Sequence, residues 1–274
     1  MNLVPAGACD CHIHVYDSRY PAAPEATLRP PDASVADYRV LQARLGTSRV
    51  VVVTPSTYGT DNRPTLDALG AFGGSARGVA VIGETVTDEQ LQALHAAGMR
   101  GIRLNLAARG GDRGLVSMEN LCARVAPLAW HLQLFGAPGL WPALEQRLRK
   151  LPVQLVFDHF GNVPGAAGVK HPAFATVSGL VRDGRAWVKL SAPMNVSAAG
   201  PPYADVAAIA RGYLAVDASR MLWGTDWPHP SLAEKPDDAA APGLLAHWCD
   251  DDAALLQEVL VRNPARVYGF ETGN

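Results

Sequence analysis

Short apolar runs rich in β-branched residues alternate with amphipathic stretches along most of the chain. The apolar runs lie at residues 8–15, 49–55, 77–82, 101–106, 131–135, 153–159, 186–191 and 220–226. Between them, apolar residues recur at helical spacing, as in Leu140, Leu144 and Leu148. Strands that alternate with helices indicate βα units and a parallel sheet. Eight such units predict a single-domain (β/α)8 TIM barrel over residues 1–274.

The competing fold is an open, doubly wound sheet. No glycine-rich, phosphate-binding turn follows the first apolar run, which argues against it. Residues 87–90 have the Thr-x-x-Gln pattern of a capping box and predict the start of a helix. Residues 16–34 contain four prolines and no periodicity, so we predict a long ordered loop over the mouth of the barrel.

The first apolar run contains two histidines, His12 and His14. A strand has a side-chain period of two, so we expect Asp10, His12 and His14 on one face and Ile13 on the other. Two neighbouring imidazoles suit two ligands of one metal ion, or two donors aimed at one carbonyl oxygen. The structural alternative is a pair of buried histidines with separate hydrogen bonds.

Polar residues stand at or near the ends of several other predicted strands. They are Ser56, Arg103, Asp158, His159, Lys189 and Asp226. The carboxyl ends of the strands meet at the mouth of a barrel, where barrel enzymes build their sites. Charged residues within apolar runs are costly unless they are paired or functional. We therefore expect one functional pocket at this mouth, with Asp226 as its strongest candidate.

Four charged or polar residues near the predicted strand ends have competing interpretations. Arg103 either forms a structural ion pair or binds an anionic ligand. Asp158 is expected to point away from the pocket, into a helix cap or a salt bridge. Lys189 faces either the lumen or the helical layer. His229, which follows the last strand, either contacts substrate or only closes the turn.

Composition narrows the classes of partner. Hydrophobic residues make up 48% of the chain and charged residues 18%, so a large buried core is expected. The net charge is −2 and there is no basic run, which argues against nucleic acid and anionic membranes as partners. The sequence shows no secretory leader, no apolar run long enough for a membrane span, and four cysteines that fit no disulfide framework. We expect a cytoplasmic protein, and a homo-oligomer stays open.

Three motifs together resemble the lactonase branch of the amidohydrolase superfamily, which includes the 2-pyrone-4,6-dicarboxylate lactonases. They are His12-x-His14, Asp158-His159-x-Gly161 and Gly224-Thr225-Asp226-Trp227-Pro228-His229-Pro230. The resemblance covers almost the whole chain, and the combination is specific although each piece alone is weak. It implies a (β/α)8 barrel hydrolase that opens a cyclic ester by adding water, with a small-molecule lactone or organic acid as its partner.

The resemblance also implies roles for the catalytic candidates. Asp226 corresponds to the general base that activates water. His12, His14 and His159 surround the lactone carbonyl and polarise it, directly or through a metal. The predicted fourth strand has no lysine of the kind that bridges a two-metal centre, and the pyrone lactonases work without metal. No cofactor is therefore expected to be required. The alternative is one divalent ion such as zinc, held by the three histidines and Asp226.

For substrate binding, the resemblance assigns Arg103 and Arg109 to substrate carboxylates and Ser56 to a hydroxyl contact, with His229 as a further candidate. Some positions depart from the family. Leu28 and Phe135 stand where tyrosines are expected, and Asn195 stands where an arginine is expected. Loss of these polar groups favours a monocarboxylate or sugar-acid lactone over a substrate with two fixed carboxylates.

Three other functions compete with lactone hydrolysis. A metal-dependent decarboxylase of the same superfamily would act on an aromatic acid. A lactone isomerase of this branch lacks the His-x-His pair and the final aspartate, so their presence here favours hydrolysis. A non-catalytic barrel that binds an organic acid would retain its role without Asp226.

Overall fold

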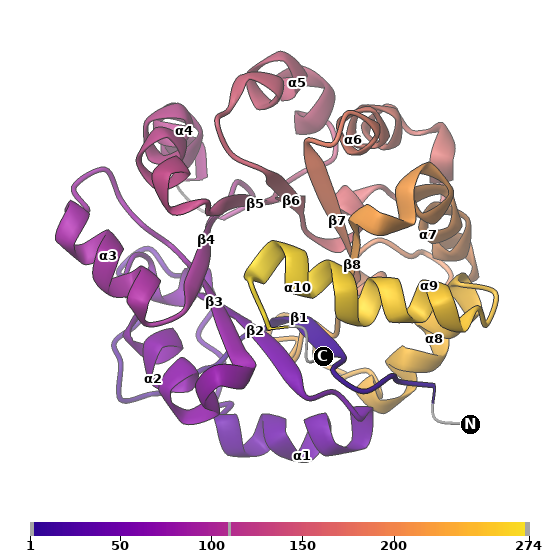
Figure 1. Ribbon diagram of the computed structural model, residues 1–274, viewed down its shortest axis with the longest axis horizontal. Coiled ribbons are helices and arrows are strands. Elements are labelled where there is room, and N and C mark those ends of the chain that lie inside the picture. The colour runs from indigo at the N-terminus through magenta and orange to yellow at the C-terminus, as the bar shows by residue number, and fades with distance from the viewer. Residues whose placement is uncertain (1–2, 109–110, 272–274) are drawn as a thin grey trace.

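The computed structural model describes residues 3–108 and 111–271, without the side chains of residues 112 and 113. Its eight strands form one parallel sheet in the order of the chain. The strands are β1 (Cys9–Ile13), β2 (Arg49–Val53), β3 (Ala76–Ala80), β4 (Met99–Asn105), β5 (His131–Phe135), β6 (Leu155–Phe157), β7 (Ala186–Ser191) and β8 (Met221–Gly224). The end of β8 returns to β1, because Asp226 N–H donates to the His12 carbonyl at 2.8 Å and His14 N–H donates to the Trp227 carbonyl at 2.8 Å. The predicted (β/α)8 barrel is confirmed (Figure 1).

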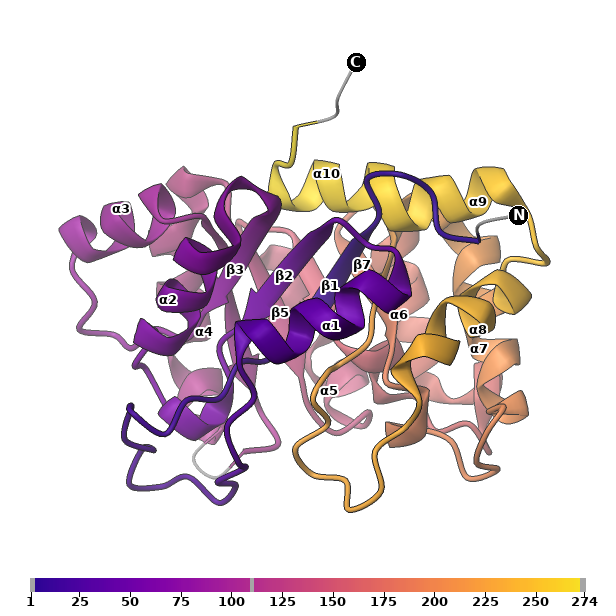
Figure 2. The ribbon, with the colours of Figure 1, turned by 90° about the horizontal axis from the view of Figure 1, so that it is seen from below.

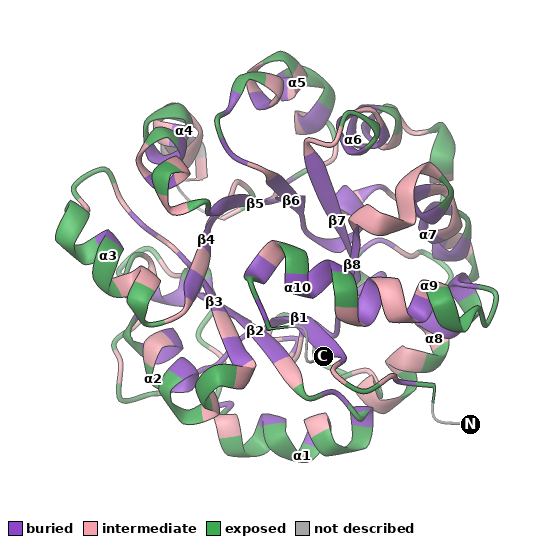
Figure 3. Cartoon of the chain, in the orientation of Figure 1, coloured by how far each residue is buried: buried purple, intermediate pink, exposed green. Residues whose placement is uncertain are grey.

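Helices surround the barrel and cover one of its ends, and buried residues alternate with exposed ones along them (Figure 3). They are α1 (Val35–Leu45), α2 (Arg63–Phe72), α3 (Asp88–Ala96), α4 (Gly111–Val125), α5 (Leu140–Lys150), α6 (Pro172–Arg182), α7 (Ala204–Asp217), α8 (Ala241–Trp248), α9 (Ala253–Gln257) and α10 (Asn263–Tyr268). The predicted capping box at the start of α3 is present, since Thr87 and Gln90 exchange side-chain and backbone hydrogen bonds. None of the described helices is long and apolar enough to span a membrane.

The two ends of the barrel differ. Helices α9 and α10 lie across the end at which the strands begin, and the long loops extend from the opposite end (Figure 2). Residues 16–34 form one of these loops and contain no helix, and a single bridge joins Tyr16 to Ala33. Strands β5 and β7 have the predicted bounds, whereas β6 stops at Phe157, two residues before the predicted end. The polar residues that follow β6 therefore lie in a turn at the mouth.

A β-bulge in β1 changes the direction of its side chains. The pairing of β1 with β2 shifts by one residue between Asp10 and Ile13. An extra residue at a bulge re-aims the side chains on either side of it. Asp10 consequently points out of the barrel, where Tyr38 of α1 donates to its carboxylate at 3.0 Å, while His12 and His14 lie close together in the lumen. The prediction that Asp10 shares a face with the two histidines is wrong.

The Asp10 carboxylate joins β1 to β8. Its Oδ1 accepts hydrogen bonds from His12 N–H at 3.1 Å and Thr225 N–H at 3.0 Å, and its Oδ2 accepts one from the Thr225 hydroxyl at 2.7 Å. Gly224 lets the two strands come this close, because a Cβ atom there would lie 2.7 Å from His12 N and 2.9 Å from His12 Cβ. The closure of the barrel and the position of His12 therefore depend on the same few atoms.

Gly224→Ala should lower the free energy of unfolding by about 1–3 kcal/mol, because the added methyl group presses on backbone that cannot move aside. It should also lower enzymatic activity, since the displaced atoms belong to His12. Urea unfolding and steady-state kinetics measure the two effects. The control is Gly243→Ala in α8, where an added Cβ has no atom within 4 Å. Equal stability of the two variants would contradict the close approach of β8 to β1.

Candidate active site

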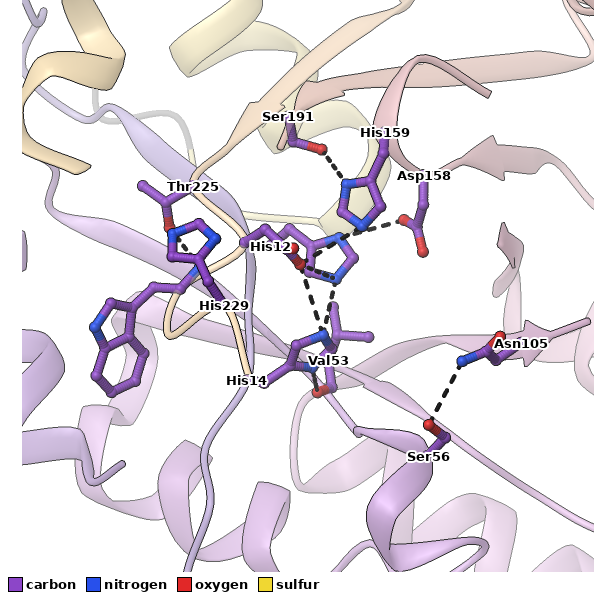
Figure 4. A network of polar contacts seen from close by, with 12 residues as sticks. His12, His14, Val53, Ser56, Asn105, Asp158, His159, Ser191, Thr225 and His229 are labelled. Carbon is purple, nitrogen blue, oxygen red and sulfur yellow. Dashed lines mark hydrogen bonds and ion pairs between the residues drawn. The ribbon is translucent and has the colours of Figure 1, made fainter. Parts of the chain in front are cut away.

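Three imidazoles and one carboxylate converge at the mouth of the barrel. The Nε2 atoms of His12, His14 and His159 lie 3.5, 3.8 and 3.5 Å from Asp226 Oδ1. His12 Nε2 and His14 Nε2 are 3.3 Å apart (Figure 4). All four residues are buried. The structure thus brings together the four residues that the sequence singled out as catalytic candidates. They come from β1 and the residue that follows it, and from the turns after β6 and β8.

Each imidazole is held through its Nδ1 atom. The partners are the Val53 carbonyl for His14 at 2.7 Å, the Ser191 hydroxyl for His159 at 2.9 Å, and the Lys189 ammonium for His12 at 3.3 Å. Because a carbonyl oxygen can only accept, His14 carries its proton on Nδ1 and turns the lone pair of Nε2 toward Asp226. Anchoring at Nδ1 fixes the orientation of all three rings and directs every Nε2 atom to one point.

The backbone is strained at two of these residues. Asp226 has a φ of 73° and His159 a φ of 48°. Residues other than glycine rarely adopt such left-handed conformations, which cost of order 1–3 kcal/mol where the rest of the structure imposes them. Here the hydrogen bond from Asp226 N–H to the His12 carbonyl helps to impose the left-handed conformation of Asp226. Strain of this kind is typical of functional positions.

A buried charge network lies beneath the imidazoles. Asp158 Oδ2 accepts from Arg103 Nε at 3.2 Å and from Gln133 Nε2 at 3.1 Å, and its Oδ1 lies 3.5 Å from Lys189 Nζ. Burial opposes ionisation of the Asp158 carboxyl, but the contact with His12 and the positive charges of Lys189 and Arg103 hold its pKa well below the usual range. The prediction that Asp158 points away from the pocket is wrong, although it does form salt bridges. Lys189 faces the lumen.

Sequence reasoning did not assign Asp158, Lys189 or Gln133 to the site. Two of the three are charged residues in or beside buried strands, where an ion has to be paired. That pattern indicates that they have partners in the lumen. It does not indicate which residues the partners are, since these come from different strands of the barrel.

A cavity of about 760 Å³ opens beside the imidazole cluster. Its lining comes from residues 21–28 of the long loop, from residues 56–61 and 81–85, and from β4 and α4. Arg103 lines this cavity and contacts Asp158, so it connects the cavity with the cluster, whose four residues do not line it. Ser56 also lines the cavity, with its hydroxyl 3.5 Å from Asn105 Nδ2 (Figure 4).

The two remaining predicted binding residues are Arg109 and His229. Arg109 lies outside the described residues. His229 is buried, and its Nε2 lies 2.7 Å from Asp238 Oδ1. The structure therefore shows His229 in a pair with Asp238, within the loop that follows β8.

Burial keeps the site imidazoles neutral. It lowers the pKa of His14 to about 4 and also lowers the pKa of His12 and of His159. Neutral imidazole has one N–H donor and one lone pair, so each ring can donate a hydrogen bond or bind a metal.

The donor set fits a divalent ion. Donor atoms of His12, His14 and Asp226 all lie within 4.8 Å of one another. Zinc–nitrogen bonds of about 2.0–2.1 Å in a tetrahedron separate neighbouring ligand atoms by about 3.3 Å. The separations of 3.3, 3.5 and 3.8 Å among these atoms are close to that value. Hydrogen bonds at the opposite ring nitrogen are also typical of metal-binding histidines.

Comparisons with known proteins identify the family of the chain. Residues 9–270 match the model of the Amidohydrolase family. The chain is 37% identical over 278 residues to a 2-pyrone-4,6-dicarboxylate hydrolase of Comamonas testosteroni, covering 97% of this chain and 91% of the relative. It is 34% identical over 270 residues to a D-galactarolactone isomerase of Agrobacterium fabrum, covering 96% and 91%. A solved structure from Agrobacterium tumefaciens superposes with a TM-score of 0.90 at 30% identity and covers 98% of each chain.

The lowered histidine pKa values predict loss of stability in acid. Unfolded histidines bind protons near pH 6.5, whereas folded His14 does so only near pH 4. Between these values the unfolded state binds more protons, so the free energy of unfolding falls as the pH falls from 6.5 to 4. Urea unfolding at pH 7.5, 6 and 5 measures the slope, to which one histidine contributes at most about 1.4 kcal/mol per pH unit.

His14→Gln should make this slope shallower, and His247→Gln, which removes an exposed histidine of α8, should not. If all three proteins show the same slope, His14 does not resist protonation in the folded state.

Proposed function

The chain belongs to the amidohydrolase family, and we propose that it hydrolyses a lactone that carries a carboxylate group. The observation that carries this proposal is the convergence of three imidazole Nε2 atoms on the Asp226 carboxylate. The name of the Comamonas relative, a 2-pyrone-4,6-dicarboxylate hydrolase, supports hydrolysis of a cyclic ester. The name of the Agrobacterium relative, D-galactarolactone isomerase, makes lactone isomerisation the second candidate. Among the described residues, no specific contact favours decarboxylation or simple binding.

In the proposed reaction, Asp226 acts as the general base. Its carboxylate takes a proton from water as the water oxygen attacks the lactone carbonyl carbon. The neighbouring imidazoles are neutral, so an N–H can donate to the carbonyl oxygen as negative charge develops there. The ring C–O bond then breaks, and the proton held by Asp226 passes to the leaving oxygen. The products are a carboxylic acid and a hydroxyl group on one open chain.

The same residues support a metal cofactor. His12, His14, His159 and Asp226 would hold a divalent ion such as zinc, which would supply Lewis-acid polarisation of the lactone carbonyl. The expectation that no cofactor is required stays a prediction. The donor set favours the alternative, in which the site holds a divalent ion.

We further propose that the substrate occupies the 760 Å³ cavity, with its carboxylate on Arg103 and its lactone carbonyl toward the imidazoles. The hydroxyls of Ser56 and Thr57 and the carboxylate of Glu84 also line this cavity. Hydroxyl and carboxylate groups bind substrate hydroxyls, and the carboxylate also repels additional anions. This lining favours a monocarboxylate or sugar-acid lactone. Residues 21–28 of the long loop would cover the bound substrate.

Asp226→Asn should lower kcat by about 10²–10⁴ with a modest change in KM, because it keeps the shape of the side chain and removes the base. A panel of lactones assayed with a pH indicator measures the rate, and NMR of the product separates an open acid from a rearranged lactone. Asp251→Asn, at an exposed position, is the control. Full activity of Asp226→Asn would exclude the proposed base, and a rearranged lactone would favour isomerisation.

Arg103→Met should raise KM for a carboxylated lactone by about 10–100-fold, because it removes a charge-assisted bond present in both the ground state and the transition state. A neutral lactone of similar size is the matched control substrate. The wild type should have a lower kcat/KM for this neutral lactone than for the carboxylated one, and Arg103→Met should change that value little. If both substrates are affected equally, Arg103 acts through Asp158 and not through the substrate carboxylate.

A further inference from the structure

Lys189 is a fully buried lysine in the barrel lumen, directly beside His12. Its ammonium group donates to Gln133 Oε1 at 2.7 Å and lies 3.3 Å from His12 Nδ1. An ammonium group has donors and no acceptor. The hydrogen bond between Lys189 and His12 therefore requires a lone pair on His12 Nδ1, which leaves the proton of the neutral ring on Nε2.

The contact between His12 and His14 leads independently to the same assignment. Their Nε2 atoms are 3.3 Å apart, so a hydrogen bond between them needs a proton on one of the two. His14 has its proton on Nδ1, where it donates to the Val53 carbonyl at 2.7 Å. The proton between the two rings consequently belongs to His12 Nε2.

Asp158 is positioned to stabilise the other tautomer. Its Oδ1 lies 3.3 Å from His12 Nδ1, yet within the described part of the chain this buried oxygen accepts no hydrogen bond. If the proton of His12 moved from Nε2 to Nδ1, Asp158 Oδ1 could accept it, and Nε2 would present a lone pair to the site. Lys189 would keep its hydrogen bond to Gln133.

We propose that Lys189 and Asp158 are positioning residues that compete for His12 Nδ1 and thereby decide whether His12 donates a hydrogen bond or binds a metal ion. With Lys189 as the partner, His12 Nε2–H points into the site and can donate to a carbonyl oxygen. With Asp158 as the partner, Nε2 offers the lone pair that a divalent ion needs. One proton changes ring nitrogen, and the charge of His12 stays the same. Only the catalytic consequence rests on the proposed function.

The tautomer can be measured in the wild-type protein without substrate. Nitrogen-15 NMR of the histidine rings distinguishes Nδ1–H from Nε2–H, and His12→Gln identifies the His12 signals. The chelator-treated protein should show His12 as the Nε2–H form, and added Zn²⁺ should convert it to the Nδ1–H form. An Nδ1–H form in the chelator-treated protein would overturn the proposal, even if the protein hydrolyses lactones.

Lys189→Met removes the competing donor and keeps a long apolar side chain. The Nδ1–H form of His12 should then become more populated without metal, because one of the two contacts that favour Nε2–H is lost. The affinity for Zn²⁺, measured by competition with a chelating dye, should rise about tenfold or more. Lys170→Met, at an exposed position, should leave both readouts unchanged. Circular dichroism checks that each variant is folded. Unchanged tautomer and Zn²⁺ affinity in folded Lys189→Met would refute the role of Lys189, and an unfolded variant would leave the decision to the wild-type spectra.

Discussion

The hydrogen bonds of the Asp10 carboxylate hold together the seam at which the barrel closes. A parallel barrel has to join its first and last strands, which are the most distant in sequence, and this seam joins β1 to the residues after β8. Asp10 accepts from His12 N–H on one side and from Thr225 on the other, beside the close approach at Gly224. Burial raises the pKa of Asp10 to about 6, against the effect of these donors. The distance between the proposed base and the two β1 imidazoles is thus a consequence of barrel closure.

The charged residues beneath the imidazoles are arranged to limit the cost of burying them. An isolated buried ion is very unfavourable, whereas a paired and hydrogen-bonded one is tolerated. Asp158 lies between Arg103 and Lys189, and the Gln133 amide contacts both the carboxylate and the ammonium. The Phe135 ring lies 5.6 Å from the Arg103 guanidinium and covers it on one side. Such a network is poor at adding stability but well suited to fixing the positions and tautomers of the groups above it.

The sequence was sufficient for the fold and for the convergence of the four residues at one mouth, because both follow from the alternation of strands and helices and from the shared direction of parallel strands. The catalytic roles of the four residues came from the family resemblance. It was not sufficient where side-chain direction depends on irregular backbone. The bulge that turns Asp10 outward is a property of the register between β1 and β2. Asp158 follows a strand of only three residues, ahead of a left-handed His159, so strand alternation could not place it. The Asp238 partner of His229 lies nine residues away in a loop without periodicity.

The places where local rules fail are also the places that determine the chemistry of the site. Asp226 and His159 adopt left-handed conformations, and a lysine occupies a lumen that packing alone would fill with apolar side chains. Each of these costs free energy, and each fixes one property of the cluster: the direction of the carboxylate, the direction of an imidazole, and the proton position on His12. The same three histidines and aspartate can then serve either as hydrogen-bonding groups or as ligands. The difference between a metal-free and a metal-binding amidohydrolase site would lie in the residues behind the imidazoles, and the His-x-His motif alone would not reveal it.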